Sequence, residues 1–249
     1  ERGLALLAEM RESGPQPDTV TCNAAIGACS RAAALEPALA LLREMPRLGV
    51  ARDAISYNAT ITACGRGRQW AAALELVREM REHCVEGDAV TCGAAVGACE
   101  KASKWQATLE LLAGARERGP APNILAYSAA VNACGKGRRW DVALELLGVA
   151  RRCELAIDAI TYNCALNACL RGARWDLSLA LFGEMRAAGA EADAVGFKAA
   201  VGACRLGRRW AEAARLQEDA RGRGLGLEVE KVDARAIGRP WHFGAEPAA

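Results

Sequence analysis

Short polar side chains recur in pairs along this 249-residue chain, once every 35 residues. Counting each unit from the residue after a recurrent Asp or Asn gives units 19–53, 54–88, 89–123, 124–158, 159–193 and 194–228. The fifth position of these units holds Asn23, Asn58, Gly93, Ser128, Asn163 and Lys198, and the last holds Asp53, Asp88, Asn123, Asp158, Asp193 and Glu228. Asp and Asn are favoured just ahead of helices, so capping is one role for the last position. Capping does not explain the fifth position, which falls inside a predicted helix where Asn and Ser are poor formers.

A basic side chain recurs at the thirteenth position of five units. These residues are Arg31, Arg66, Lys101, Lys136 and Arg171. A run of charge is usually only a solvated face, but one basic residue per unit at a constant phase gives a linear array that matches a phosphate backbone.

The elements that must position these residues are two helices per unit. Apolar residues at unit positions 4, 8 and 11, as in Tyr57, Ile61 and Cys64, lie on one face of a first helix. A Gly recurs at position 14, as in Gly67, and we expect it to be the left-handed residue that ends this helix. A second helix opens at position 17, and a second Gly follows it at position 31 in most units, as in Gly49. The sequence predicts an all-α solenoid of stacked helical hairpins, because one hairpin cannot bury its own apolar face.

Trp and Cys also recur at constant positions, and each could have a functional or a structural role. Trp opens the second helix in five units (Trp70, Trp105, Trp140, Trp175 and Trp210), and it could stack on bases or pack between hairpins. Packing is favoured, because the Trp residues are in phase with the Leu ridge and Leu35 takes the place in the first unit. Six cysteines at position 11 are expected to be core residues: Cys29, Cys64, Cys99, Cys134, Cys169 and Cys204.

The remaining polar residues and the composition suggest no catalytic chemistry. The sequence contains no CxxC pair and no Cys/His cluster of the kind that holds zinc. The large number of cysteines expected in the core favours a reducing compartment. The sequence leaves open whether Cys84 and Cys153 are exposed, and His83 and His242 have no partner at metal or triad spacing. We expect no cofactor, no metal, no catalytic residue and no small-molecule substrate.

Composition places the chain among globular proteins. It is 52% hydrophobic and 25% charged, which excludes disorder, and no apolar run reaches the roughly 18 residues that span a bilayer. Its net charge of +2 argues against strong non-specific binding of nucleic acid. Residues 1–18 match the second half of a unit, so we expect a truncated repeat there and a longer parent array. Residues 229–249 are predicted to form a partial cap and a flexible tail.

The chain resembles the pentatricopeptide repeat family, in its plain class of uniform repeats. The resemblance covers roughly residues 1–228 and rests on the 35-residue period and the Asp-Ala-Ile-Thr-Tyr-Asn opening at 158–163. It also rests on the basic residue after the buried Cys and on second helices of the Ala-Leu-Glu-Leu-Leu type followed by Glu-Met. Tetratricopeptide repeats, with a 34-residue period and a Trp-x2-Leu-Gly-x2-Tyr signature, do not match.

The resemblance implies a right-handed superhelix that binds single-stranded RNA, one base per repeat. In it the fifth and last positions read the base, and the second position clamps it through Val20, Ile55, Val90, Leu125, Ile160 and Val195. An ionised Asp only accepts hydrogen bonds, so it favours the imino N–H of uracil or guanine. Asn with Asp therefore implies U at units one, two and five, and Ser with Asp implies G at unit four.

Units three and six depart from the family pattern. Gly93 with Asn123 is similar to the family's adenine reader but lacks its hydroxyl, and Lys198 with Glu228 matches no combination. The sixth unit is degenerate, and it either caps the array or contacts only phosphate. Because family arrays run along RNA from 5′ to 3′, the implied core is 5′-UU(A/purine)GU-3′.

The family acts mainly in plastids (chloroplasts) and mitochondria, so either organelle is the expected location. RNA processing, stabilisation, editing or translation is the expected process, with single-stranded RNA and other RNA-processing proteins as partners and no membrane. A protein-binding solenoid of tetratricopeptide type is an alternative, although it gives no reason for the polar pairs. An enzyme is an alternative only through a catalytic domain outside this chain.

Overall fold

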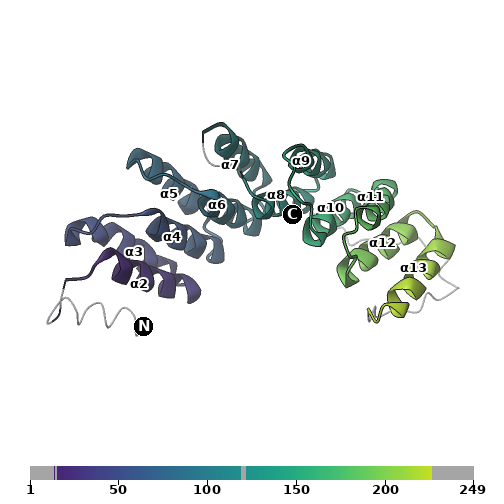
Figure 1. The fold of residues 1–249 in the computed structure, drawn as a ribbon, viewed down its shortest axis with the longest axis horizontal. Coiled ribbons are helices and arrows are strands. Elements are labelled where there is room, and N and C mark those ends of the chain that lie inside the picture. The colour runs from purple at the N-terminus through teal and green to yellow at the C-terminus, as the bar shows by residue number, and fades with distance from the viewer. Residues whose placement is uncertain (1–13, 15, 119–121, 226–249) are drawn as a thin grey trace, which may run out of the picture.

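The computed structural model describes residue 14 and residues 16–118 and 122–225, which form an α-solenoid (Figure 1). The prediction of an all-α solenoid is confirmed, since every element in these residues is helical. Most of the predicted truncated repeat at 1–18, and the whole predicted cap and tail at 229–249, lie outside the described residues. Within the described ranges, no helix has the length and apolar character needed to cross a membrane.

Each unit contributes two antiparallel helices. The first helices are α2 (Thr19–Arg31), α4 (Ala54–Arg66), α6 (Ala89–Lys101), α8 (Ile124–Lys136), α10 (Ala159–Arg171) and α12 (Ala194–Leu206). The second helices are α3 (Leu35–Glu44) with its 3-10 extension η1 (Met45–Leu48), α5 (Trp70–Glu82), α7 (Trp105–Arg118), α9 (Trp140–Arg152), α11 (Trp175–Ala187) and α13 (Trp210–Gly222).

The two sets of helices form two layers. Successive first helices pack directly on one another, whereas the second helices pack on the first helices of their own and the following unit. Stacking is therefore tighter along the first helices, and the array bends into an arch with α5, α7 and α9 on its outer side (Figure 1). The first helices form the inner surface of this arch.

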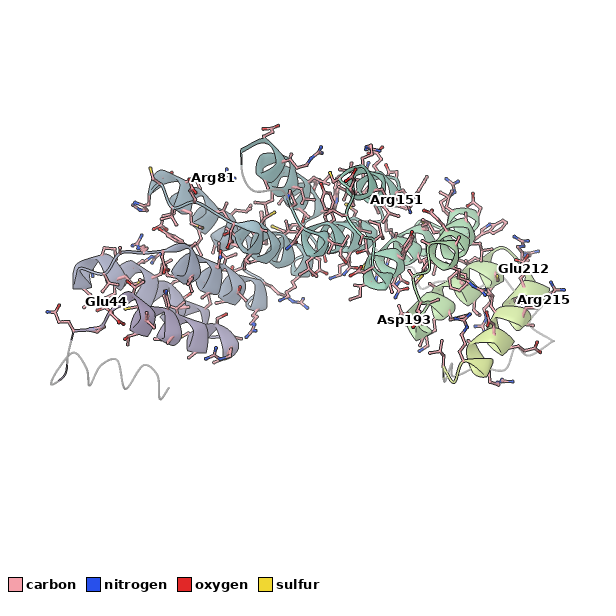
Figure 2. The ribbon with its side chains drawn as sticks, viewed as in Figure 1. Glu44, Arg81, Arg151, Asp193, Glu212 and Arg215 are labelled. Carbon is pink, nitrogen blue, oxygen red and sulfur yellow. The ribbon has the colours of Figure 1, made fainter. Side chains whose placement is uncertain are left out.

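Every first helix begins directly after a capping residue. The side chains of Asp18, Asp53, Asp88, Asn123, Asp158 and Asp193 each accept a hydrogen bond from a backbone amide in the first turn (Asp193 is labelled in Figure 2). At Asp53 and Asp88 the backbone N–H of the cap residue in turn donates to the hydroxyl of the third helical residue, Ser56 or Thr91. The capping role considered for the last unit position is thus confirmed, and such a cap contributes about 1 kcal/mol.

The six cysteines at unit position 11 are core residues, as the sequence predicts. Cys29 is 6% exposed and the other five are fully buried, between the two helical layers. Burial raises the pKa of Cys64, Cys99, Cys134 and Cys169 to about 11, because a thiolate would lose its hydration there. Cys84 and Cys153, which the sequence leaves undecided, are exposed.

The prediction of a left-handed Gly at unit position 14 is wrong. Gly137, Gly172 and Gly207 have φ between −83° and −78°, and the left-handed residue is the next one along the chain, with φ of 56–57°. Glycine is present for another reason: a Cβ on Gly172 would lie 2.1 Å from Cδ1 of Trp140 in the preceding unit. The missing side chain makes room for a Trp ring. At position 31 the glycines Gly49, Gly189 and Gly224 do have a left-handed conformation, with φ of 71–74°.

The Trp residues pack between units, as the sequence favours. A Cβ on Gly137 would lie 2.4 Å from Trp105, and one on Gly207 would lie 2.6 Å from Trp175. A basic residue of the following unit covers the ring in three junctions: Lys104 over Trp70, Arg139 over Trp105 and Arg174 over Trp140, at 4.5–5.2 Å from the ring centroid. Trp70, Trp105 and Trp140 thus each contact a basic residue of the next unit through a cation–π interaction.

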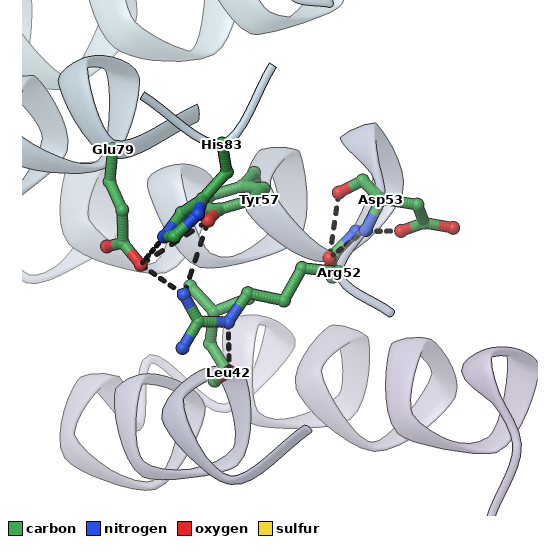
Figure 3. Close-up of polar contacts among 7 residues, drawn as sticks. Leu42, Arg52, Asp53, Tyr57, Glu79 and His83 are labelled. Carbon is green, nitrogen blue, oxygen red and sulfur yellow. Dashed lines mark hydrogen bonds and ion pairs between the residues drawn. The ribbon is translucent and has the colours of Figure 1, made fainter. Parts of the chain in front are cut away.

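A polar cluster fills the junction of units one and two on the outer side (Figure 3). Arg52 donates to the carbonyl of Leu42 at 2.8 Å and pairs with Glu79, and the Tyr57 hydroxyl lies 3.3 Å from the Glu79 carboxylate. One unit later the residues at the positions of Arg52, Tyr57 and Glu79 are Gly87, Cys92 and Gly114. An open cavity of about 730 Å³, lined by α5, α6 and α7 and including Gly87 and Cys92, lies at that junction.

Candidate nucleic-acid interface

A ridge of exposed apolar side chains runs along the inner surface. It consists of Val20, Ile55, Val90, Leu125, Ile160 and Val195, one in the first turn of each first helix, with exposed fractions of 47–74%. They are six of the eight large apolar side chains exposed in the described residues. Single exposed apolar residues are ordinary, but one per unit at a constant phase makes a continuous surface suited to flat, apolar faces.

The polar pair at the fifth and last positions is joined by hydrogen bonds in the three Asn/Asp units. Asn23 Nδ2 lies 3.1 and 3.0 Å from the two carboxylate oxygens of Asp53. In the other two units the amide donates to Oδ1, at 3.2 Å from Asn58 to Asp88 and at 2.9 Å from Asn163 to Asp193. Each pair spans the junction between one first helix and the next, beside the apolar ridge.

The pairing fixes the orientation of the amide. The Oδ1 atoms of Asn23, Asn58 and Asn163 are buried without a hydrogen-bond partner. The Oδ1 atom of Asn163 lies close to Gly196, since a Cβ added to that glycine would be 2.9 Å from it. Turning the amide over would place its oxygen against the carboxylate of the Asp. The Nδ2 group therefore faces the Asp. It has two N–H bonds, and at Asn58 and Asn163 one of them remains for a further acceptor.

The capping carboxylates use only one of their oxygens in three units. At Asp88, Asp158 and Asp193 every hydrogen bond within the described residues goes to Oδ1. Oδ2 is therefore an acceptor without a partner in this part of the chain. Hydrogen bonds from Thr91 and from Asn58 hold the pKa of Asp88 below its usual value, so this carboxylate is ionised at neutral pH.

The other three units differ from this arrangement. Gly93 has no side chain, and a Cβ there would meet nothing within 4 Å, so the space beside Asn123 is open. Ser128 is buried, and its Oγ lies 4.0 Å from Sγ of Cys164. In the sixth unit Lys198 is exposed, and Glu228 lies outside the described residues.

The five basic residues lie in the last turn of their helices, about 16 Å along the helix axis from the apolar ridge. All five are exposed. Arg66 donates to the carbonyl oxygen of Ser30 at 2.8 Å, and Lys136 contacts Glu100. Arg31, Lys101 and Arg171 form no hydrogen bond or ion pair with any described residue. The eleven-residue separation from the ridge, three turns of helix, places both series on the same face.

Profiles of known protein families match most of the repeat array. The profile of the PPR repeat family matches residues 17–66, that of the pentatricopeptide repeat domain matches 75–137, and that of the PPR repeat matches 55–85, 125–154 and 160–189. Together the matches run almost without a break from residue 17 to residue 189. The chain belongs to the pentatricopeptide repeat family. No curated protein sequence matches it significantly.

Solved structures of other pentatricopeptide repeat proteins share the fold. Maize PPR10 superposes with a TM-score of 0.68 at 24% identity, covering 90% of this chain and 32% of its own. PPR10 in complex with an 18-nucleotide psaJ RNA element gives 0.59 at 24% identity, over 90% and 37%. The repeat domain of Arabidopsis thaliana protein-only RNase P 1, in complex with tRNA, gives 0.58 at 15%, over 68% and 89%. The chain spans about a third of the PPR10 chains.

Sequence reasoning missed several residues on the inner surface of this repeat protein. Asn132 and Cys164 lie on first helices beside the predicted site residues, and Glu100 contacts both Asn132 and Lys136. The sequence does carry a signal for Glu100. It is the one acidic residue directly before a basic residue at position 13, where the other units have Ser30, Gly65, Gly135 and Leu170.

Proposed function

We propose that this pentatricopeptide repeat protein binds single-stranded RNA along the inner surface of its first helices, one base per unit. The proposed core is 5′-UU(A/purine)GU-3′. The observation that carries the proposal is the repeated arrangement of an exposed apolar residue beside an amide–carboxylate pair, which at Asn58/Asp88 and Asn163/Asp193 keeps a donor and an acceptor unused. PPR10, which was solved with an RNA element, supports the choice of ligand.

Uracil matches the hydrogen-bonding groups of the Asn/Asp pairs. Its N3–H can donate to a carboxylate oxygen, and a neighbouring carbonyl can accept the second N–H of the Asn amide. Adenine presents a bare nitrogen where uracil has N3–H, so it would face the Asp lone pairs without a proton between them. Units one, two and five, with Asn23, Asn58 and Asn163, are therefore assigned to U.

Unit four is assigned to guanine. Ser128 is shorter than Asn and does not bond to Asp158, which leaves room beside the carboxylate for a purine. Guanine N1–H can donate to the unused Oδ2 of Asp158, as we propose for uracil N3–H at Asp88 and Asp193. At unit three, Gly93 leaves still more room and Asn123 both donates and accepts, which suits a purine.

The apolar ridge and the basic residues complete the proposed site. Branched aliphatic side chains on either side of a base can hold its flat faces, a sequence-independent contribution like that of other single-strand stacking surfaces. The exposed cations at the far end of each helix are proposed to contact the phosphate backbone, so affinity should fall with salt. Replacing Arg31, Arg66 and Lys101 together is expected to weaken binding strongly and to reduce its salt dependence.

We infer a role in RNA processing, stabilisation, editing or translation within a plastid or mitochondrion, on the basis of family membership. Other RNA-processing proteins are proposed as partners. Repeats of this family also occur in a protein-only RNase P, so the binding role proposed for this chain is compatible with an enzyme as the whole protein. A peptide-binding role is disfavoured by the amide–carboxylate pairs, which a peptide would not need once in every unit.

RNA selection from a random pool tests the proposal. We expect the purified protein to enrich a UURGU-like core, and the Asn163→Ser variant to change its last base from U to G. Gln106→Ser, an amide-to-hydroxyl change on the exposed surface of α7, is the matched control and should leave the motif unchanged. If no single-stranded motif is enriched, the proposed function is wrong. A last base that stays U in Asn163→Ser contradicts the residue assignment.

A further inference from the structure

Glu100 forms an unusual contact across the inner surface. It lies in the last turn of α6, and its Oε1 accepts hydrogen bonds from two side chains of α8, at 2.8 Å from Asn132 Nδ2 and 2.5 Å from Lys136 Nζ. Lys136 Nζ also lies 3.4 Å from the backbone carbonyl oxygen of Glu100. The Glu100 side chain is only 14% exposed, so its charge depends on these two partners.

No other basic residue at position 13 is held in this way within the described residues. Arg66 makes the nearest equivalent contact, but its partner is the backbone carbonyl of Ser30, which is uncharged. The positive charge of Arg66 is therefore not neutralised, whereas that of Lys136 is neutralised by a carboxylate from the preceding unit. The difference arises from one residue, since the other units have no acid before the basic residue.

We propose that Glu100 withholds Lys136 from the RNA backbone, so that unit four reads its base without holding a phosphate. The proposal rests on the RNA-binding function proposed above. A phosphate that approached Lys136 would have to displace Glu100, and the displaced carboxylate would remain beside the phosphate as a repelling charge. The array then holds the backbone through Arg31, Arg66 and Lys101 on one side of unit four and through Arg171 on the other.

The salt dependence of binding gives the expected size of the effect. For single-stranded nucleic acid, each phosphate neutralised by a cation contributes about −0.7 to the slope of log K against log[salt]. Four contacts give a slope of about −2.8, and a fifth contact through a released Lys136 gives about −3.5. At roughly 0.1 M salt one such contact corresponds to about fivefold in affinity, and this gain disappears near 1 M.

The test measures affinity between roughly 0.1 M and 1 M salt for an RNA that carries the proposed core. Glu100→Gln keeps an oxygen for Asn132 and removes only the charge. We expect it to bind about fivefold more tightly at the lowest salt and to steepen the slope by about 0.7. Glu110→Gln makes the same charge change on the exposed surface of α7 and is expected to leave both quantities within experimental error.

Two lysine variants show whether the gain passes through Lys136. In the unmodified protein, Lys101→Gln should weaken binding about fivefold at the lowest salt, because Lys101 is not paired with a carboxylate in the described residues. Adding Lys136→Gln to Glu100→Gln should remove the gain. A urea-unfolding midpoint for each variant identifies any effect that comes from altered stability.

The outcomes separate this proposal from the proposed function. If the unmodified protein binds the RNA and Glu100→Gln behaves like Glu110→Gln, Glu100 does not withhold Lys136 and the proposal is overturned. A gain that persists in the double variant also overturns it, because the effect would then be a general one of charge. If the unmodified protein binds no RNA at any salt concentration, the proposed function fails and this proposal fails with it.

Discussion

Replacing Gly172 with Ala tests the packing of Trp residues between units. A Cβ on Gly172 would lie 2.1 Å from Cδ1, 2.7 Å from Cγ and 3.0 Å from Nε1 of Trp140. These atoms belong to a rigid ring, and the Arg174 guanidinium covers that ring at 4.5 Å from its centroid. The ring therefore cannot turn aside to relieve the overlap. The second helix of unit four and the first helix of unit five must move apart.

The expected cost follows from the size of this overlap. Overpacking of a well-packed site destabilises a protein by about 1–3 kcal/mol. Gly183→Ala is the matched control, because Gly183 lies inside α11 and a Cβ there would meet nothing within 4 Å. It is expected to stabilise the protein by about 0.5–1 kcal/mol, since Ala loses less conformational entropy than Gly in a helix. The same chemical change should thus have opposite signs at two positions.

Urea unfolding followed by circular dichroism measures both changes as shifts of the midpoint. A second arm introduces Gly172→Ala into Trp140→Leu, since unit one has Leu35 at the Trp position and a Cβ on Gly67 would lie 3.7 Å from it. The glycine substitution should cost much less there. Equal shifts for Gly172→Ala and Gly183→Ala, or an undiminished cost beside Leu, would refute the argument from space.

Four further predictions concern the thiols, the caps and the cavity. Cys84 and Cys153 should be the cysteines that react rapidly with iodoacetamide in the folded protein, measured by mass spectrometry, because they are exposed. Between pH 9 and about 11 the unfolding free energy should fall, since unfolded thiols ionise before buried ones, and Cys134→Ala should reduce this slope by about 1.4 kcal/mol per pH unit. Asp88→Ala should cost about 1 kcal/mol at pH 7 and progressively less below pH 4, because the lowered pKa of Asp88 makes its contribution disappear only as the carboxylate is protonated. Ala115→Met should raise the free energy of unfolding, measured by urea denaturation, by about 0.5–2 kcal/mol, because it fills part of the cavity between units two and three.

Much of the fold follows from the repeat itself. A constant period places residues such as Ile61 and Cys64 at the same phase of successive helices, and burial of that face then requires stacking. The caps were predictable for the same reason, since Asp precedes an apolar helical pattern in unit after unit. These features depend on local sequence and on one neighbouring unit.

Features that depend on side-chain space between units were not predictable. Gly172 fits a helix end by its residue type, and only the position of the Trp140 ring shows that it provides space. The contact between Glu100 and Lys136 joins residues 36 positions apart, and no local rule pairs them. The amide–carboxylate pairs show the limit for the site, because the sequence places Asn163 and Asp193 in register but not the orientation of the amide.

Equilibrium binding to two RNAs of equal length tests the central claim most directly. One RNA carries 5′-UUGGU-3′, and the other has adenine in place of the three uracils assigned to the Asn/Asp units. A wrong base costs about 1–3 kcal/mol, so three together should weaken binding by at least about 100-fold at a fixed salt concentration. Affinities that agree within about twofold would contradict the claim that each Asn/Asp pair reads one base.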